Sequence, residues 1–248
     1  MEAANEHTCG VTYPDNRAYC WGLNSIGQLG DGTHLNHQIP TAVHSSLLFR
    51  QVSLGSAHTC GVTTDNRAFC WGSNHQAQLG DSTQVGSRRT PYPVAGGRQY
   101  RQLEAGASHT CAVTTSDRAF CWGDGRAGQL GTGKTYLSFW PRAVAGGLLF
   151  GRVTAGDGHT CGETTTHQAY CWGSNYRGSL GDGTTTPRLK PVAVAGGLTF
   201  GQVSAGVYHT CGKTAAGVGY CWGPNDLGQL GDGTTTDRLT PTPVASAM

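Results

Sequence analysis

The sequence predicts an all-β protein built from five copies of one unit of about 50 residues. The tripeptide His-Thr-Cys recurs every 50 or 51 residues, and Trp-Gly follows it in phase in every copy. No stretch shows the 3.6-residue apolar period of a helix, whereas apolar and polar residues alternate as in half-buried strands. The two motifs begin at His7 and Trp21, His58 and Trp71, His109 and Trp122, His159 and Trp172, and His209 and Trp222. A fixed period of this length is typical of stacked or radial repeats.

The repeats cover nearly the whole chain, so we expect one repeat domain over residues 1–248. The first unit lacks the counterpart of residues 196–202, and the last unit stops before that segment, so one strand is expected to be missing at the seam. Five units then either close into a ring with an imperfect seam or form a segment of a larger ring. The approximate units are 1–44, 45–95, 96–145, 146–195 and 196–248.

The second unit shows the expected elements most completely. Residues 49–54 alternate as a strand, and residues 60–63 and 68–71 form a hairpin around a turn whose Asp and Asn tolerate turn geometry. A register centred on the turn places Cys60 opposite Cys70, with Cβ atoms about 4.5 to 5.5 Å apart. That separation suits a disulfide only in a close, non-hydrogen-bonded pair. The polar stretch after Gly80 is expected to be a loop.

Composition excludes several classes of protein. Seventeen Lys and Arg against fifteen Asp and Glu give a net charge of +2, and no basic stripe extends beyond Arg88-Arg89, which argues against nucleic-acid binding. The 39 glycines arrive in phase with the repeat, as expected for tight turns. No apolar run approaches the roughly 18 residues of a spanning helix, and the first residues lack the regions of a signal peptide. We expect no membrane insertion, and if the protein is exported, this chain is a processed form or a fragment.

Ten cysteines fall two to a repeat with none left over. We expect five disulfides and therefore an oxidising, extracytoplasmic location. Free thiols and metal binding are the alternatives, but each unit offers two Cys and one His without the short spacing of zinc sites. A bridge across so short a loop contributes at most about 2 to 3 kcal/mol. The expected pairs are Cys9 with Cys20, Cys60 with Cys70, Cys111 with Cys121, Cys161 with Cys171, and Cys211 with Cys221.

The motifs His-Thr-Cys-x-Val-Thr-Thr, Cys-Trp-Gly and Asn-x-x-Gly-Gln-Leu-Gly-Asp-Gly-Thr resemble those of the regulator of chromosome condensation (RCC1) family. Gly-Gly pairs and one Trp per repeat could also suggest kelch repeats, but these lack Gly-Gln-Leu-Gly. The resemblance implies a β-propeller whose blades are four-stranded sheets around a channel. Family rings usually have seven blades, so five copies depart from the pattern. The paired cysteines are similar to those in repeats of exported bacterial proteins.

Family members differ in activity: they exchange nucleotide on a small GTPase, dock on chromatin, sense ultraviolet light or inhibit β-lactamases. Fold alone does not choose among these activities, although the paired cysteines argue against a nuclear exchange factor. In the plant ultraviolet receptor the residue two before His-Thr is a sensing Trp. Here those positions hold other residues, so core packing better explains the Cys-Trp-Gly tryptophans. The residues at those positions are Ser56, Ala107, Asp157 and Val207.

We expect no catalytic residue, cofactor or metal site. The repeated histidines are better explained as packed or hydrogen-bonded core residues, because no repeated acid and nucleophile accompany them. Each Gly-Asp-Gly-Thr run supplies one carboxylate, fewer oxygen ligands than a calcium loop uses, so we interpret Asp31, Asp182 and Asp232 as turn formers.

The copies differ in three places: the pair before His (Asn5-Glu6 in the first unit), the pair inside the Gly-Gln-Leu-Gly loop, and the long excursion after it. All three are expected to be loops on a rigid ring, where binding residues concentrate. They supply Tyr, Arg, His and Trp, which are favoured in binding hot spots; neutral variation is the alternative. The candidate binding residues are Tyr136, Phe139, Trp140, Arg126, Tyr176, Arg177, Tyr208 and His75.

The sequence therefore predicts an extracytoplasmic, disulfide-linked propeller that acts as a non-catalytic binding scaffold for an unidentified protein partner. One alternative is an enzyme regulator, either a β-lactamase-type inhibitor or a GTPase exchange factor. Another is carbohydrate binding through the aromatic loop from Tyr136 to Trp140.

Overall fold

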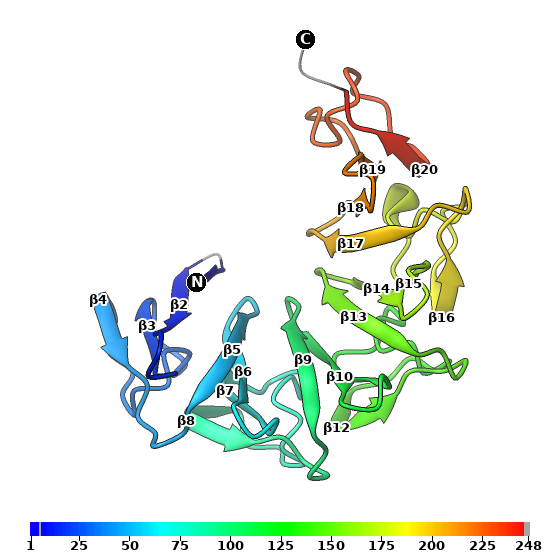
Figure 1. Ribbon diagram of the computed structural model, residues 1–248. Coiled ribbons are helices and arrows are strands. Elements are labelled where there is room, and N and C mark those ends of the chain that lie inside the picture. Colours follow the sequence, from blue (N-terminus) through cyan, green and yellow to red (C-terminus); the bar gives the residue numbers. More distant parts are fainter. Residues whose placement is uncertain (5, 246–248) are drawn as a thin grey trace. The chain divides into compact units, whose positions relative to one another are not determined.

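The structure, a computed structural model, describes residues 1–4 and 6–245. It contains five four-stranded antiparallel sheets, each built from the strands of one repeat in chain order (Figure 1). Among the described residues the single helical segment is the 3-10 turn η1 (Tyr176–Gly178). The all-β prediction is confirmed, and each sheet is the four-stranded blade that the family resemblance implies.

The blades are numbered one to five along the chain. Blade 1 has β1 (Glu2–Ala3), β2 (His7–Val11), β3 (Ala18–Gly22) and β4 (His37–Ala42); blade 2 has β5 (Phe49–Leu54), β6 (His58–Thr63), β7 (Ala68–Ser73) and β8 (Ser87–Pro93). Blade 3 has β9 (Tyr100–Ala105), β10 (His109–Thr114), β11 (Ala119–Gly123) and β12 (Ser138–Ala143). Blade 4 has β13 (Phe150–Ala155), β14 (His159–Thr164), β15 (Ala169–Gly173) and β16 (Arg188–Ala193); blade 5 has β17 (Phe200–Ala205), β18 (Thr210–Thr214), β19 (Gly219–Gly223) and β20 (Arg238–Pro243).

The chain divides into two compact units. Unit 1 comprises Met1–Ser116, Phe120–Asp124 and Leu137–Arg142, and holds blades 1 and 2 and most of blade 3. Unit 2 comprises Asp117–Ala119, Gly125–Tyr136 and the chain from Ala143 on, and holds blades 4 and 5 together with a connecting loop of blade 3. The organisation of the repeats into one domain remains a prediction.

The hairpin of blade 2 has the predicted register. Strand β5 begins at Phe49 and ends at Leu54, and Cys60 lies opposite Cys70 on β6 and β7. The same facing positions hold the two cysteines of blades 1, 4 and 5, so one register serves these repeats as well.

All five expected disulfides are present. The bridged Cα atoms are 4.0 to 4.1 Å apart in every blade, close to the separation of about 4.5 Å in a non-hydrogen-bonded pair. The described chain contains no free cysteine. The prediction of one bridge per repeat is therefore confirmed. The pairs are Cys9 with Cys20, Cys60 with Cys70, Cys111 with Cys121, Cys161 with Cys171, and Cys211 with Cys221.

Two expectations about the strands need correction. The strand expected to be missing from the first unit is present in shortened form, because Glu2 and Ala3 pair with β2. The long excursions are only partly loops: their second halves form the fourth strands, so that Phe139 and Trp140 lie in β12. These fourth strands contain proline, such as Pro141 in β12. Proline in a sequence argues against a strand, but a strand at the edge of a sheet tolerates it.

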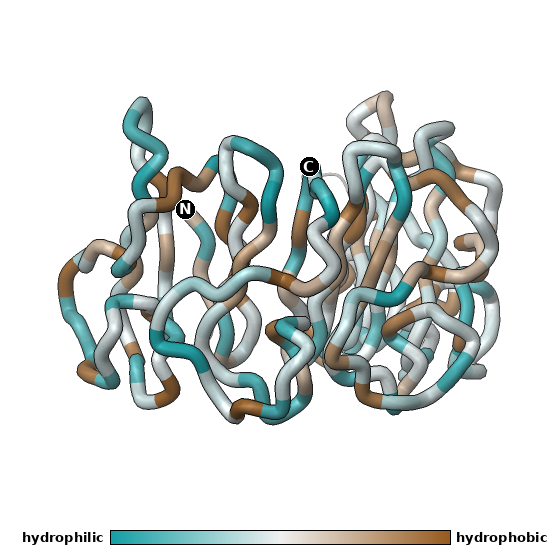
Figure 2. The backbone as a smooth tube through the Cα atoms, turned by 90° about the horizontal axis from the view of Figure 1, so that it is seen from below, coloured by the Kyte–Doolittle hydropathy of each residue, from teal (hydrophilic) through white to brown (hydrophobic). Residues whose placement is uncertain are grey.

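Repeated aromatic residues pack in the core at blades 2 to 5. The tryptophans of blades 2 to 5 are fully buried, and each packs against the ring at the start of its own first strand at 5.6 to 6.1 Å between centroids. The core interpretation of these four tryptophans is confirmed. Figure 2 shows apolar residues as short segments separated by polar turns. No helix in the described part of the chain is long and apolar enough to cross a membrane.

Candidate binding surface

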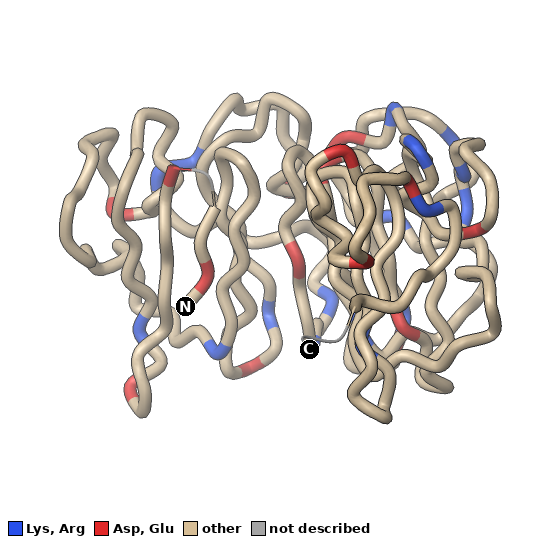
Figure 3. The backbone as a smooth tube through the Cα atoms, turned by 90° about the horizontal axis from the view of Figure 1, so that it is seen from above, with Lys and Arg blue, Asp and Glu red and all other residues tan. Residues whose placement is uncertain are grey.

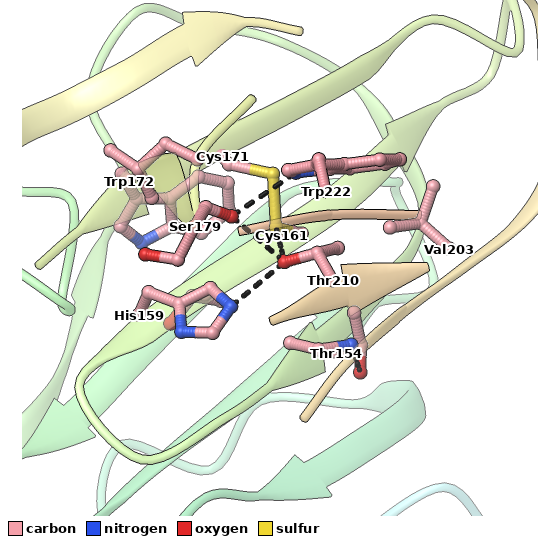
Figure 4. The surroundings of a disulfide bond; sticks show 12 residues. Thr154, His159, Cys161, Cys171, Trp172, Ser179, Val203, Thr210 and Trp222 are labelled. Atoms are coloured by element: carbon pink, nitrogen blue, oxygen red, sulfur yellow. Dashed lines mark hydrogen bonds between the residues drawn. A yellow bond between two sulfur atoms is a disulfide. The ribbon is translucent and has the colours of Figure 1, made fainter. Parts of the chain in front are cut away.

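The repeated His-Thr pair joins neighbouring blades within a unit. His159 Nε2 lies 2.9 Å from Thr210 Oγ1, and this hydroxyl donates to the Ser179 carbonyl at 2.9 Å (Figure 4). The indole N–H of Trp222 donates to the same carbonyl at 3.1 Å. The equivalent histidine–threonine pairs in unit 1 are His7 with Thr59 and His58 with Thr110.

These contacts assign the ring proton of the histidines that make them. Because a carbonyl can only accept, the single hydroxyl proton of Thr110 goes to the Gln78 carbonyl, and its oxygen accepts from His58 Nε2–H. His58 Nδ1 is buried without a hydrogen-bond partner among the described residues, so nothing there accepts a second proton and the ring is neutral. Burial lowers the pKa of His58 to about 3 and that of His7 to about 4. The predicted core role of the repeated histidine is the one these contacts support.

The Gly-Gln-Leu-Gly loop is held by its own asparagine. In blade 2, Asn74 Oδ1 accepts from Leu79 N–H at 3.1 Å, and Asn74 Nδ2 donates to Asp81 at 3.3 Å. Asp81 also accepts from Thr83 N–H at 3.0 Å and pairs with Arg88 of the fourth strand at 2.8 Å. Asp31, Asp182 and Asp232 of the Gly-Asp-Gly-Thr runs likewise accept from the backbone N–H two residues later, which supports the turn interpretation.

Three of the eight candidate residues come together in unit 2. The rings of Tyr176 and Tyr208 lie 5.5 Å apart, and each side chain is about half exposed, at 53% and 52%. Arg177 donates two hydrogen bonds to Asp226, one of them at 2.7 Å, and two to Asp237, one of them at 2.8 Å. Leu227, beside Asp226, is 90% exposed. We name Tyr176, Arg177, Tyr208, Asp226 and Leu227 the tyrosine–arginine cluster.

A single departure from the repeat shapes this cluster. In the other four loops a glutamine side chain accepts from the backbone N–H two residues before it, as Gln78 does from Gln76 at 2.8 Å. Blade 4 has Ser179 at that position, and its hydroxyl donates to the Ser174 carbonyl instead. Released from the glutamine, Arg177 adopts the left-handed region at φ 52°, and the loop forms η1.

The charges of the cluster stabilise one another. Hydrogen bonds from Arg177 hold the pKa of Asp226 below its usual value, and hydrogen bonds to Asp226 and Asp237 raise the pKa of Arg177. A left-handed non-glycine residue costs on the order of 1 to 3 kcal/mol and persists only where its surroundings hold it. Here the two carboxylates hold it. Sequence reasoning missed Asp237 and ranked Asp226 and Leu227 below the other variable residues.

Trp140 belongs to a different part of the fold. It lies on β12, the outer edge of blade 3, and is 47% exposed. Together with Gly96, Arg98, Pro141 and Arg142 it lines a shallow pocket in unit 1. Its neighbour Phe139 is half-buried, and the Phe139 carbonyl accepts from the Ser82 N–H.

The other candidates are distributed over both units. His75 is exposed on the blade 2 loop, with its ring close to Gly86. Arg126 is exposed and Tyr136 half-buried, both in the connecting loop of blade 3. Of the variable pair Asn5-Glu6, Asn5 lies outside the described residues.

Charge is mixed over the molecule. Figure 3 shows Lys and Arg interspersed with Asp and Glu along the described part of the chain. Across the residues that the structure describes, no group of three or more His, Cys, Asp and Glu side chains could hold a metal ion.

The whole chain, residues 1–248, matches the family model of the RCC1-like domain. The chain belongs to this family. The family resemblance drawn from the motifs is therefore confirmed, and the five sheets are RCC1-like blades. Among solved structures, human WBSCR16 superposes with a TM-score of 0.86 at 20% identity, over 98% of this chain and 66% of that one. Prp20p of Saccharomyces cerevisiae gives 0.84 at 20% identity, over 97% and 61%. At such identities these likenesses show the fold alone.

The RCC1-like chain also has curated relatives. The Ultraviolet-B receptor UVR8 of Arabidopsis thaliana is 32% identical over 140 residues, which are 55% of this chain and 31% of the receptor. The human Probable E3 ubiquitin-protein ligase HERC4 is 30% identical over 132 residues, 51% of this chain and 12% of the ligase. The match thus spans less than a third of either relative.

Proposed function

We propose that this RCC1-like chain is a non-catalytic scaffold that binds another protein through the tyrosine–arginine cluster. One observation supports this most strongly. Residues that repeat are buried and hydrogen-bonded to one another, whereas three residues that differ between copies, Tyr176, Arg177 and Tyr208, meet at the surface of blades 4 and 5. These variable residues thus lie where they leave the scaffold intact.

The cluster has the composition of a binding hot spot. Tyrosine and arginine are enriched among residues that contribute most to protein interfaces. Arg177 is already fixed by Asp226 and Asp237, so binding would immobilise few additional side-chain torsions. Tyr208 and Leu227 add exposed apolar area beside these charges.

The relatives support a protein as partner. The structure of yeast Prp20p is described with its binding to Gsp1p and histones, and yeast RCC1 has been solved bound to Kap60. The human X-linked retinitis pigmentosa GTPase regulator is 30% identical over 137 residues, which favours enzyme regulation as the second candidate function. The five disulfides support an extracytoplasmic location, so the partner is expected there.

The test is a quantitative affinity purification from the extracytoplasmic fraction of the source cells. We would compare the native chain, a double variant with Tyr176→Ala and Tyr208→Ala, and a control with Tyr13→Ala and Tyr92→Ala, which removes two exposed tyrosines elsewhere. We expect a protein that the native chain and the control retain and that the cluster variant loses by about tenfold or more. Equal retention by all three chains would refute the proposal.

A partner found in this way also decides between the two candidate functions. If it is an enzyme, titrating it with this chain should either reduce its turnover stoichiometrically or accelerate nucleotide release from a GTPase. If turnover and nucleotide release both stay unchanged, the chain is a scaffold alone.

A further inference from the structure

We propose a second binding site, for an acidic carbohydrate, in the pocket on the outer edge of blade 3. The site is lined by Arg98, Trp140 and Arg142. It is separate from the tyrosine–arginine cluster and does not depend on protein binding there.

Blade 3 differs from the other blades at three positions that belong to one hydrogen-bond network. In blades 2, 4 and 5 an arginine at or next to the start of the fourth strand pairs with the Asp of the loop turn, as Arg188 pairs with Asp182 at 2.7 Å. Blade 3 has Ser138 in place of that arginine and Thr132 in place of that aspartate. The asparagine that holds the loop elsewhere is replaced by Gly125. All three members of one network are thus lost together, which releases the outer strand from this constraint.

Ser138 makes a different set of hydrogen bonds within the outer strand. The Ser138 hydroxyl donates to the Trp140 carbonyl at 2.8 Å and accepts from Arg142 Nε at 3.2 Å. Arg142 is held beside the indole, with its Cζ atom 6.0 Å from the ring centroid. The positions equivalent to Trp140 in the other blades hold no aromatic residue: they are Ile39, Thr90, Lys190 and Thr240.

The pocket combines an exposed aromatic ring with two cations. The guanidinium of Arg98 is fixed over the Phe120 ring, with its Cζ atom 4.4 Å from the centroid. Neither Arg98 nor Arg142 pairs with a carboxylate among the described residues. The complementary ligand therefore has a flat apolar face for Trp140 and a negative group for the guanidiniums.

An acidic sugar residue meets both requirements. The C–H face of a pyranose can pack on the indole, and its carboxylate or sulfate can accept paired hydrogen bonds from guanidinium groups. The pocket is shallow and on an outer strand, so a polymer can pass through it with both ends in solvent. Nucleic acid also combines aromatic rings with anions. Nucleic-acid binding, however, relies on more basic residues than the two arginines of this pocket. Of the aromatic segment from Tyr136 to Trp140, Trp140 is the residue that lines this pocket.

The experiment is isothermal titration of the whole chain with defined oligosaccharides. The probes are hexagalacturonate for carboxylate, a heparin-derived hexasaccharide for sulfate, neutral maltohexaose, and dT6 as a nucleic-acid control. We expect at least one acidic hexasaccharide to bind about tenfold or more tightly than maltohexaose and dT6. Trp140→Leu, Arg98→Gln and Arg142→Gln should each weaken that binding by about five- to tenfold. Arg89→Gln, an exposed arginine on outer strand β8, should change it by less than about twofold.

Each contrary result overturns a named part of the proposal. No binding of either acidic probe at millimolar concentration rejects the site, and equal binding of maltohexaose rejects the acidic class. Tighter binding of dT6 assigns the pocket to nucleic acid. A loss with Arg89→Gln equal to that with Arg142→Gln shows diffuse charge attraction in place of a site. Trp140 and Arg142 are exposed, so these two variants should keep the native circular dichroism spectrum.

Discussion

Two glycines show what the repeat requires of a single residue. Gly181 has φ +68°, and a Cβ atom there would lie 2.6 Å from Trp222 Nε1. Gly197 has nearly the same conformation, φ +65°, but a Cβ atom there would meet nothing within 4 Å. Comparing the two glycines separates backbone strain from close packing. Gly181 needs both a left-handed backbone and the absence of a Cβ atom, whereas Gly197 needs only the left-handed backbone.

We predict that Gly181→Ala destabilises the protein more than Gly197→Ala. Both variants place alanine in the left-handed region, at about 1 to 2 kcal/mol. Gly181→Ala also forces the methyl group into the indole, which adds about 1 to 3 kcal/mol. Urea denaturation of both variants measures the difference, and equal midpoints would show that the indole moves aside without cost.

At the scale of the element, the hairpin was predictable from sequence. The positions of Cys60 and Cys70 about one turn set the register, and the structure has that register. The fourth strands were not predictable, because their proline and charged residues satisfy an edge position that only the complete sheet defines. The left-handed backbone of Arg177 was not predictable either, although the sequence shows Ser179 in place of the repeated glutamine.

The disulfides differ in access to solvent. Both cysteines are fully buried in blades 1 to 4, whereas Cys211 of blade 5 is half-buried. Thiol–disulfide exchange requires the attacking thiolate to reach a sulfur atom, so exposure governs its rate.

We therefore predict that mild reductant opens the bridge between Cys211 and Cys221 first. Native protein should gain no mass on alkylation, whereas brief treatment with dithiothreitol followed by alkylation should modify these two cysteines before the other eight. Peptide mapping by mass spectrometry identifies the modified pair. Alkylation of native protein without reductant would contradict the disulfide assignment and the extracytoplasmic location inferred from it.

At the scale of the whole molecule, the buried histidines make stability depend on pH. Burial lowers the pKa of His7 and His109 from 6.5 to about 4 and that of His58 to about 3. Between pH 6.5 and 4.5 the unfolded chain therefore binds more protons than the folded one, and stability falls as the pH falls. Burial raises the pKa of Glu163, which acts in the opposite direction because its folded form binds the proton more readily.

We predict that the free energy of unfolding, measured by urea denaturation, declines from pH 6.5 to 4.5, with a slope of at most about 1.4 kcal/mol per pH unit for each histidine. His58→Gln should flatten the decline, since glutamine can still donate to Thr110 but does not titrate. A decline of unchanged slope in this variant would mean that His58 is not the titrating group.

The binding surface could be predicted only in part. Variation between copies pointed to Tyr176, Arg177 and Tyr208, and the structure brings these three together. Their proximity could not be derived from the sequence, because it arises where the loop of blade 4 meets the turn between β17 and β18 of blade 5. Asp237 was missed for the same reason, since its role depends on an arginine 60 positions earlier in the chain.

The central claim is that repeated residues hold the scaffold while the residues that differ remain available for binding. Thr210 and Tyr208, two positions apart, test it by urea denaturation of Thr210→Val and Tyr208→Ala. Thr210→Val removes the hydroxyl shared by His159 and Ser179 and should cost about 1 to 3 kcal/mol. Tyr208→Ala should cost about 0.5 kcal/mol, as exposed positions do. A loss with Tyr208→Ala as large as that with Thr210→Val would contradict the claim, because the cluster would then be part of the scaffold.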